Sequence, residues 1–257
     1  MTILRSMALA FAMFSRLPAP KVAWNARNMR YMMAGFPLVG AVIGLLLLGW
    51  GALCRRLGLG VALTACGLTL IPVAVTGGIH LDGFCDTVDA LSSHAEPKRK
   101  REILKDPHMG AFAGIGLGAY LLLYFSLCLT LKPSCRALVL LLCAHVLSRV
   151  FSALSVISLP CESGAGTLHS FSDAADKRAV FGTLVVLTAI CAAAMLYVSL
   201  MGGVLMLLAA AGCFWRLAQV ARKEFGGMRG DLAGWFLQLC ELFCLGTLVI
   251  AQKGGWL

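Results

Sequence analysis

Hydrophobic stretches long enough to cross a membrane recur through most of the chain, and polar residues gather between them. A membrane-spanning helix needs about 20 mostly apolar residues. This criterion predicts seven spans, at roughly 34–53, 58–77, 111–131, 137–157, 179–200, 203–220 and 232–251. The apolar stretch 3–17 is shorter and is predicted to form an N-terminal interfacial or re-entrant helix. We therefore expect an all-α, polytopic membrane bundle that forms a single domain over residues 1–257.

The composition agrees with a membrane protein. Hydrophobic residues make up 60% of the chain and charged residues only 13%, whereas soluble domains carry about 25% charged residues. The net charge of +10 suits anionic lipid headgroups or anionic substrates. With this apolar content, nucleic acid is not expected as a partner. Most of the eleven cysteines lie in apolar runs without a CxxC pair, and we expect them to be small buried residues.

The distribution of charge predicts an orientation in the membrane. If the N-terminus is cytoplasmic, 16 of the 22 Lys and Arg residues fall on the cytoplasmic side and five on the other, with Arg149 inside a span. Cytoplasmic loops are enriched in basic residues, so the N-terminus is predicted inside and the C-terminus outside. The polar segments 78–110, 158–178 and 221–231 then all face the cytoplasm. Any chemistry is expected at that face.

The most polar stretch, residues 80–110, contains a row of carboxylates. Asp82, Asp86 and Asp89 are spaced so that a helix would place all three on one face, where like charges repel. Such a row needs a cation, and Mg²⁺ is usually held by one or two carboxylates and by substrate phosphates. We therefore predict that these aspartates bind metal and act in catalysis, with Gly83 leaving room for a bulky ligand. The alternative is a solvated helix face.

Further polar residues flank this row. His80 could end a helix or contact substrate, and Lys98–Arg101 could face lipid or attract an anionic substrate. Asp106 could add a carboxylate and Lys105 could neutralise a phosphate, unless Asp106 caps the following helix.

Two other regions could bind anions. A glycine-rich loop before the last span predicts a phosphate site, with Asp231 as the helix N-cap in the alternative interpretation; its candidate residues are Gly226, Gly227, Arg229, Gly230 and Asp231. The segment 162–166, with Gly164 and Gly166, is a weaker example.

Two charged residues lie at similar depth within predicted spans. An isolated charge inside a membrane is costly. Arg149 and Glu241 are therefore expected to face the bundle interior and to share a polar network.

The motifs together resemble one family. The run HLDGFCDTVDAL at 80–91, followed by REILKDPHMG at 101–110, is similar to the signature region of the cobalamin synthase (adenosylcobinamide-GDP ribazoletransferase) family. FSRLPAP at 14–20, FPLVG at 36–40 and the glycine-rich loop resemble its other motifs. The chain differs from the family pattern at Arg229, usually a threonine, and in the lead into residues 162–166.

The resemblance implies a reaction and a location. Adenosylcobinamide-GDP would be joined to α-ribazole or its 5′-phosphate with release of GMP, in a Mg²⁺-dependent displacement at the bacterial inner membrane. In this reaction Mg²⁺ would be held by Asp82, Asp86 and Asp89. As an alternative to a metal-binding role, Asp89 or Asp106 could remove a proton from the 5′-hydroxyl group of ribazole. Assembly into homo-oligomers is compatible with the sequence.

Two other functions are weighed. A CDP-alcohol phosphotransferase also uses aspartates at a membrane border, but this chain has D-G-x-x-D-x-x-D and no second D-x-x-x-D. An ion-coupled transporter would need acids deep within several spans, and only Glu241 qualifies.

Overall fold

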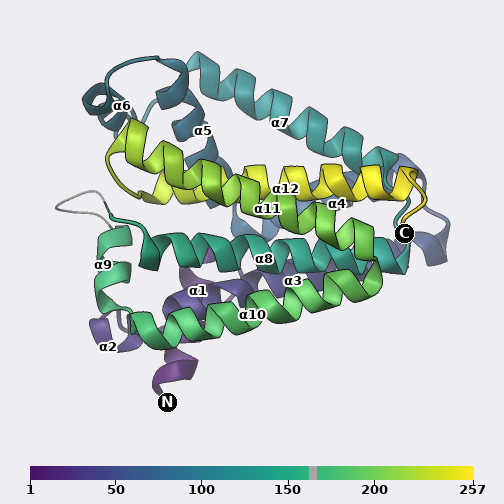
Figure 1. Cartoon of the computed structure of the whole chain (residues 1–257), viewed down its shortest axis with the longest axis horizontal. Helices are drawn as coiled ribbons and strands as arrows, with labels where there is room; N and C mark the ends of the chain where they lie inside the picture. The colour runs from purple at the N-terminus through teal and green to yellow at the C-terminus, as the bar shows by residue number, and fades with distance from the viewer. Residues whose placement is uncertain (162–166) are drawn as a thin grey trace.

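The computed structural model describes residues 1–161 and 167–257, and the chain there is almost entirely helical. One isolated bridge pairs Cys161 with Met228. The helices, labelled as in Figure 1, are α1 (Thr2–Phe14), α2 (Ala26–Met29), α3 (Met32–Leu57), α4 (Val61–Thr76), α5 (Ile79–Ser92), α6 (Pro97–Ile103), α7 (Ala111–Thr130), α8 (Cys135–Ser158), α9 (Thr167–Ala174), α10 (Lys177–Val198), α11 (Leu200–Val220), the π-helical turn η1 (Ala221–Phe225) and α12 (Gly230–Lys253).

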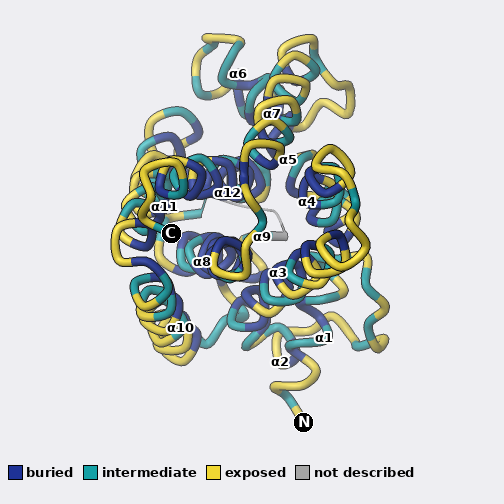
Figure 2. The backbone as a smooth tube through the Cα atoms, turned by 90° about the vertical axis from the view of Figure 1, so that its right-hand side faces the viewer, coloured by how far each residue is buried: buried dark blue, intermediate teal, exposed yellow. Residues whose placement is uncertain are grey.

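Six of the seven predicted spans are long apolar helices. Within the described residues, α3, α7, α8, α10, α11 with η1, and α12 are long and apolar enough to cross a membrane. In the most apolar 18-residue stretch of α8, 78% of the residues are buried, whereas the corresponding share is 22% in α7 and in α10. Helix α8 therefore lies inside the bundle, while α7 and α10 carry many exposed residues (Figure 2). The exposed residues of α7 and α10 include large apolar ones such as Leu122 and Ile190. The polytopic all-α prediction is confirmed.

The seventh span, predicted over 58–77, is replaced by a bent pair of helices. Helix α4 has 16 residues, which at 1.5 Å per residue gives roughly 24 Å, short of the ~30 Å apolar core of a bilayer. It joins α5 through a bend of 93°. Gly77 and Gly78 adopt φ angles of +67° and +82° at this bend, a conformation that favours glycine. The bend turns the acidic helix α5 away from the direction of α4.

Small residues allow the central helices to approach closely. Cβ atoms added to Gly40 and Gly44 of α3 would lie 2.3 Å from the His145 carbonyl oxygen and 2.4 Å from the Leu142 side chain of α8. Gly35 instead faces Met7 of α1. The glycines of the first span therefore serve close helix packing, as small residues do in membrane bundles. The short helix α1 packs on α3 rather than standing apart.

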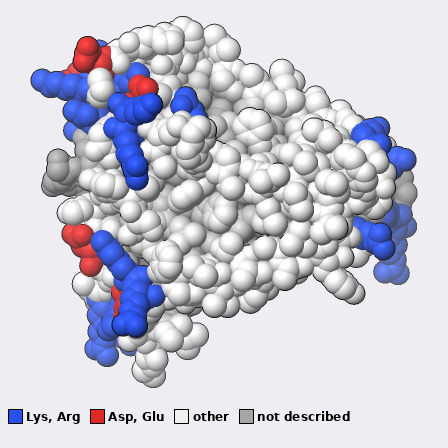
Figure 3. Space-filling view, viewed as in Figure 1, with Lys and Arg blue, Asp and Glu red and all other residues white. Residues whose placement is uncertain are grey.

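Charged side chains gather at the two ends of the bundle, with an uncharged belt between them on the face seen in Figure 3. On that face the acidic side chains lie only at the end that also carries α2, α6 and α9 (Figures 1 and 3). The C-terminus lies at the opposite end. This arrangement is that of a membrane-embedded bundle with a polar, acid-containing end.

Candidate active site

The predicted aspartate row lies on one helix, α5. Asp82 is exposed and Asp86 and Asp89 are partly exposed, while the opposite face of the helix, with Phe84 and Ala90, is buried. The charges of Asp82 and Asp89 are close enough to act on Asp86. No ion pair to Asp82 or Asp86 occurs within residues 1–161 and 167–257. The row therefore presents an unneutralised negative surface.

A fourth aspartate joins this surface from α12. Helices α5 and α12 cross at Gly83 and Gly234, where an added Cβ would lie 2.9 Å from the Asp231 Cα and 2.8 Å from the His80 carbonyl oxygen, respectively. Gly83 was expected to leave room for a ligand, but it leaves room for the first turn of α12. The crossing places Asp231 beside Asp82, and their charges interact. This neighbour could not be read from the sequence, because nearly 150 residues separate the two positions.

Asp231 was considered as the N-cap of the last helix, but that position is held by Arg229. The Arg229 Nε atom lies 3.7 Å from the Asp231 carboxylate. Asp231 thus sits in the first turn of α12 with a cation beside it, where the helix dipole favours negative charge.

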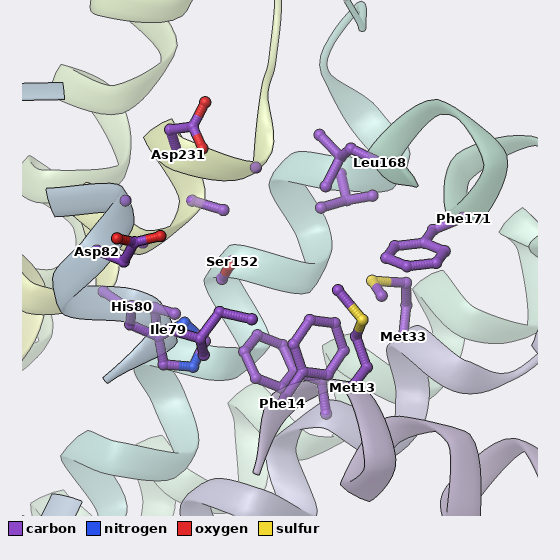
Figure 4. Close-up of a pocket in the computed structure, with 17 residues that line it drawn as sticks. Met13, Phe14, Met33, Ile79, His80, Asp82, Ser152, Leu168, Phe171 and Asp231 are labelled. Carbon is purple, nitrogen blue, oxygen red and sulfur yellow. The ribbon is translucent and has the colours of Figure 1, made fainter. Parts of the chain in front are cut away.

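A cavity of about 180 Å³ opens beside Asp82 and Asp231. Its walls come from six helices, α1, α3, α5, α8, α9 and α12. Asp82 and Asp231 lie on one side, and apolar side chains that include Phe14 and Phe171 lie on the other (Figure 4). The cavity therefore has one acidic side and one apolar side.

His80 belongs to the wall of this cavity. Its ring is buried, with its centroid 5.7 Å from that of Phe36, and its Nε2 atom has no hydrogen-bond partner in the described part of the chain. The sequence placed His80 at the site but did not indicate its aromatic surroundings, since Phe14 and Phe36 come from distant segments.

Asp89 faces a different neighbour from Asp82. Its Oδ1 atom accepts a hydrogen bond of 3.3 Å from the Ala113 N–H, in the first turn of α7. A Cβ on Gly110, the N-cap of α7, would lie 2.0 Å from Asp89 Oδ2. Asp89 therefore accepts a hydrogen bond from a free N–H group at the N-terminus of α7, as a capping residue does. It does not line the cavity.

Asp106 and Lys105 lie in the exposed connection before α7. Asp106 accepts hydrogen bonds from the His108 backbone N–H and from the His108 ring, and these bonds lower the pKa of Asp106. Asp106 thus forms a local turn, not the cap of α7. Neither residue lines the cavity.

The glycine-rich loop uses some of its N–H groups internally. Both Gly226 and Gly227 donate to the Ala221 carbonyl oxygen, and Met228 donates to the Pro160 carbonyl oxygen at 2.7 Å. Gly230, in contrast, lines the cavity at the start of α12. The backbone N–H groups at Gly230 and in the first turn of α12 lack intrahelical acceptors. If this loop binds an anion, these N–H groups are therefore the ones best placed to do so. The weaker candidate at 162–166 lies outside the described residues.

Two residues of the basic run 98–101 make contacts inside the protein. Lys100 is buried and pairs with Glu224 of η1, and the Arg101 guanidinium donates to the Phe225 carbonyl oxygen at 3.3 Å. These contacts tie α6 to η1, which leads into the loop before α12.

Arg149 and Glu241 form a buried ion pair between α8 and α12. The Arg149 guanidinium also donates to the Ser148 hydroxyl at 3.0 Å, and the His145 Nε2 atom lies 3.5 Å from the Glu241 carboxylate. The two charges share one polar cluster inside the bundle.

The aspartates fit a metal ion only in combination with a substrate. Among the described residues, no three His, Cys, Asp or Glu side chains converge tightly enough to form a metal site by themselves. The unpaired oxygens of Asp82 and Asp86 do suit Mg²⁺, which takes one or two protein carboxylates and completes its shell with substrate phosphates and water. The donor set therefore fits a metal that arrives with a phosphorylated substrate.

The fold and the site together define a polytopic membrane protein with an acid-lined cavity at one end of its bundle. Residues 6–249 match the family described as cobalamin-5-phosphate synthase. The chain belongs to this family. It is therefore a transferase that acts in the final step of cobalamin synthesis, and the phospholipid-synthase and transporter alternatives are set aside.

Several curated relatives support the assignment. An adenosylcobinamide-GDP ribazoletransferase from Lachnoclostridium phytofermentans is 43% identical over 97% of this chain and 95% of its own length. Proteins of the same name from Geobacillus kaustophilus (34% identical, 93% of each chain) and Pseudomonas syringae pv. syringae (37%, 84% of this chain and 86% of its own) are also similar. No solved structure matches the chain.

Proposed function

We propose that this chain joins adenosylcobinamide-GDP to α-ribazole, or to α-ribazole 5′-phosphate, at the acidic side of the cavity beside α5 and α12. The observation that carries the proposal is the juxtaposition of Asp82 and Asp231, from two distant segments, at one cavity with a half-buried third carboxylate, Asp86, next to them. The choice of substrates follows the name of the relatives, adenosylcobinamide-GDP ribazoletransferase.

The reaction is a displacement at phosphorus. A ribose hydroxyl oxygen forms a bond to the cobinamide-side phosphorus, the bond from that phosphorus to the bridging oxygen breaks, and GMP leaves with the electron pair. The family's description as cobalamin-5-phosphate synthase supports a product that keeps the 5′-phosphate. The attacking group is then a hydroxyl of the ribose ring, not the 5′-hydroxyl expected from the sequence.

Each aspartate has a different part in this scheme. Asp82 and Asp86 are the residues that would hold Mg²⁺, which would supply charge neutralisation for the phosphate groups. Asp231 faces the same space from α12 and accepts the hydroxyl proton. Gly230 and the first turn of α12 offer N–H groups to a phosphate oxygen, with Arg229 nearby. Asp89 holds α7 in place instead of binding the metal.

The site is proposed to face the cytoplasm. The acids lie at the end that carries the more basic loops, which by the positive-inside rule is the cytoplasmic end. The protein would then lie in the bacterial inner membrane, with its N-terminus inside and its uncharged belt in contact with lipid. Self-association remains a prediction.

The test is GMP release by the purified protein in detergent. We expect release that requires α-ribazole and Mg²⁺, stops with EDTA, and falls by about 100-fold or more in Asp82→Asn, because a metal ligand is lost. Glu102→Gln, which removes an exposed carboxylate paired with Arg99, is the matched control and should retain activity. Full activity of Asp82→Asn would contradict the proposed site.

A further inference from the structure

The cavity beside Asp82 has an apolar side that the displacement at phosphorus does not use. Phe36 and Met33 of α3 and Phe171 of α9 are buried there, at 3%, 2% and 5% exposure. Phe14 joins them from α1 (Figure 4). An apolar hollow with a carboxylate side suits a ligand that is itself apolar at one end and polar at the other.

Aromatic rings dominate this apolar side. The ring centroids of Phe14 and Phe36 are 4.1 Å apart, and Phe171 meets Phe14 edge-on at 6.4 Å. The ring of His80 lies in the same cluster. Aromatic rings prefer offset-stacked and edge-to-face neighbours, and methionine sulfur adds favourable contacts at ring edges. The surface is thus suited to a flat aromatic ligand.

The size of the cavity selects between the two substrates. Pockets for drug-sized ligands measure about 300–1,000 Å³, whereas this cavity measures about 180 Å³. It has room for a compact ring system and not for a corrin macrocycle with its amide side chains. Adenosylcobinamide-GDP also carries two compact flat bases, guanine and adenine, but both have polar ring and exocyclic groups that an apolar wall leaves without hydrogen-bond partners. The benzimidazole base of ribazole is the compact ring system that is largely apolar, so it suits this side of the cavity best.

We infer that the apolar side of this cavity binds the benzimidazole base of the ribazole substrate and sets which bases the enzyme accepts. This inference rests on the proposed function. The base lies among Phe14, Phe36 and Phe171, and the ribose leaves the cavity on the side of Asp82 and Asp231. Base binding then fixes the position of the attacking hydroxyl at the acidic side.

The test uses ribosides that differ only in the size of the base. These are benzimidazole riboside, which lacks the two methyl groups of α-ribazole, α-ribazole itself, and naphthimidazole riboside, which has one more ring. Each is assayed by GMP release with adenosylcobinamide-GDP saturating. The ratio of kcat/KM values between bases is independent of the folded fraction of a variant, so partial loss of stability cannot imitate the effect.

Two variants change the cavity in opposite directions. Phe171→Ala enlarges it and should shift the kcat/KM ratio towards naphthimidazole riboside by about tenfold or more, the scale of small size differences in apolar pockets. Leu168→Phe narrows it from a partly exposed wall position and should shift the ratio towards benzimidazole riboside. Phe181→Ala, on the exposed surface of α10, is the control and should leave all ratios unchanged.

The results separate this inference from the proposed function. Unchanged base ratios in both cavity variants, or an altered KM for adenosylcobinamide-GDP with no change for ribazole, would overturn the base site while the reaction stands. If wild-type protein releases no GMP, the proposed function fails. The base site is then decided by equilibrium binding of α-ribazole alone, followed by its fluorescence. Leu168→Phe should weaken this binding and Phe181→Ala should not; equal binding by both would overturn the inference.

Discussion

At the scale of single residues, the molecule buries a pair of charges within the bundle. Arg149 and Glu241 are only 1% and 2% exposed, and Ser148 and His145 complete their surroundings. Burial of a lone charge is expensive, whereas a paired and hydrogen-bonded charge is tolerated. The pair therefore joins α8 to α12, the helix whose first turn carries Asp231.

Breaking the pair should destabilise the protein. Glu241→Gln or Arg149→Gln leaves one buried charge without its partner, and we expect each to lower the free energy of unfolding by about 3–5 kcal/mol. The double variant should lose less than the sum of the two, because no lone charge remains. Thermal unfolding in detergent measures this cycle. Strict additivity would show that the two residues do not interact.

At the scale of helices, the site depends on how closely α5 and α12 cross. Gly83 and Gly234 have no room for a side chain at the contact. The crossing brings the first turn of α12 against the acidic face of α5, while Asp89 ties the other end of that face to α7. The geometry of the carboxylates is therefore set by backbone contact and not by side-chain packing alone.

A single methyl group at this crossing should impair the enzyme. The Cβ of Gly234→Ala would lie 2.8 Å from the His80 carbonyl oxygen, which forces the helices apart. Gly246→Ala is the control on the same helix, because its nearest neighbour would be 3.9 Å away. We expect Gly234→Ala to lower both Tm and GMP release, and Gly246→Ala to leave activity intact and to raise stability by about 0.5–1 kcal/mol at most. Equal behaviour of the two variants would contradict the importance of the crossing.

At the scale of the whole molecule, the bundle separates two environments. An uncharged belt covers the middle of the face in Figure 3, and the acidic side chains on that face gather at one end. The cavity proposed as the reaction site lies towards that end, since α9 and the first turn of α12 line it. On this proposal, charged substrates need not enter the apolar belt. The bent pair α4–α5 is what turns the aspartate row to this position.

The sequence was sufficient to predict the helical class, six of the seven expected spans and the helix that carries Asp82, Asp86 and Asp89. Long apolar runs and an i, i+4, i+7 spacing depend only on local order. It was not sufficient for the bend at Gly77 and Gly78, because an apolar run does not encode a change of direction.

The cavity and the proximity of Asp82 to Asp231 were also beyond the sequence. Phe14, Phe36 and Phe171 look like ordinary apolar residues in isolation, and only tertiary packing shows that they surround a space. In the same way, Asp89 belongs to the acidic row by spacing, but its contact with the N-terminus of α7 separates it from Asp82.

The claim that Asp82 holds the metal is tested most directly by changing the chemistry of that ligand. In Asp82→Cys a soft thiolate replaces a hard carboxylate, so the variant should be inactive with Mg²⁺ and regain ribazole-dependent GMP release with a softer ion such as Zn²⁺ or Cd²⁺. Asp89→Cys should show no such change of metal preference, and wild-type protein assayed with each ion controls for the native cysteines. Unchanged Mg²⁺-dependent activity in Asp82→Cys would contradict the account.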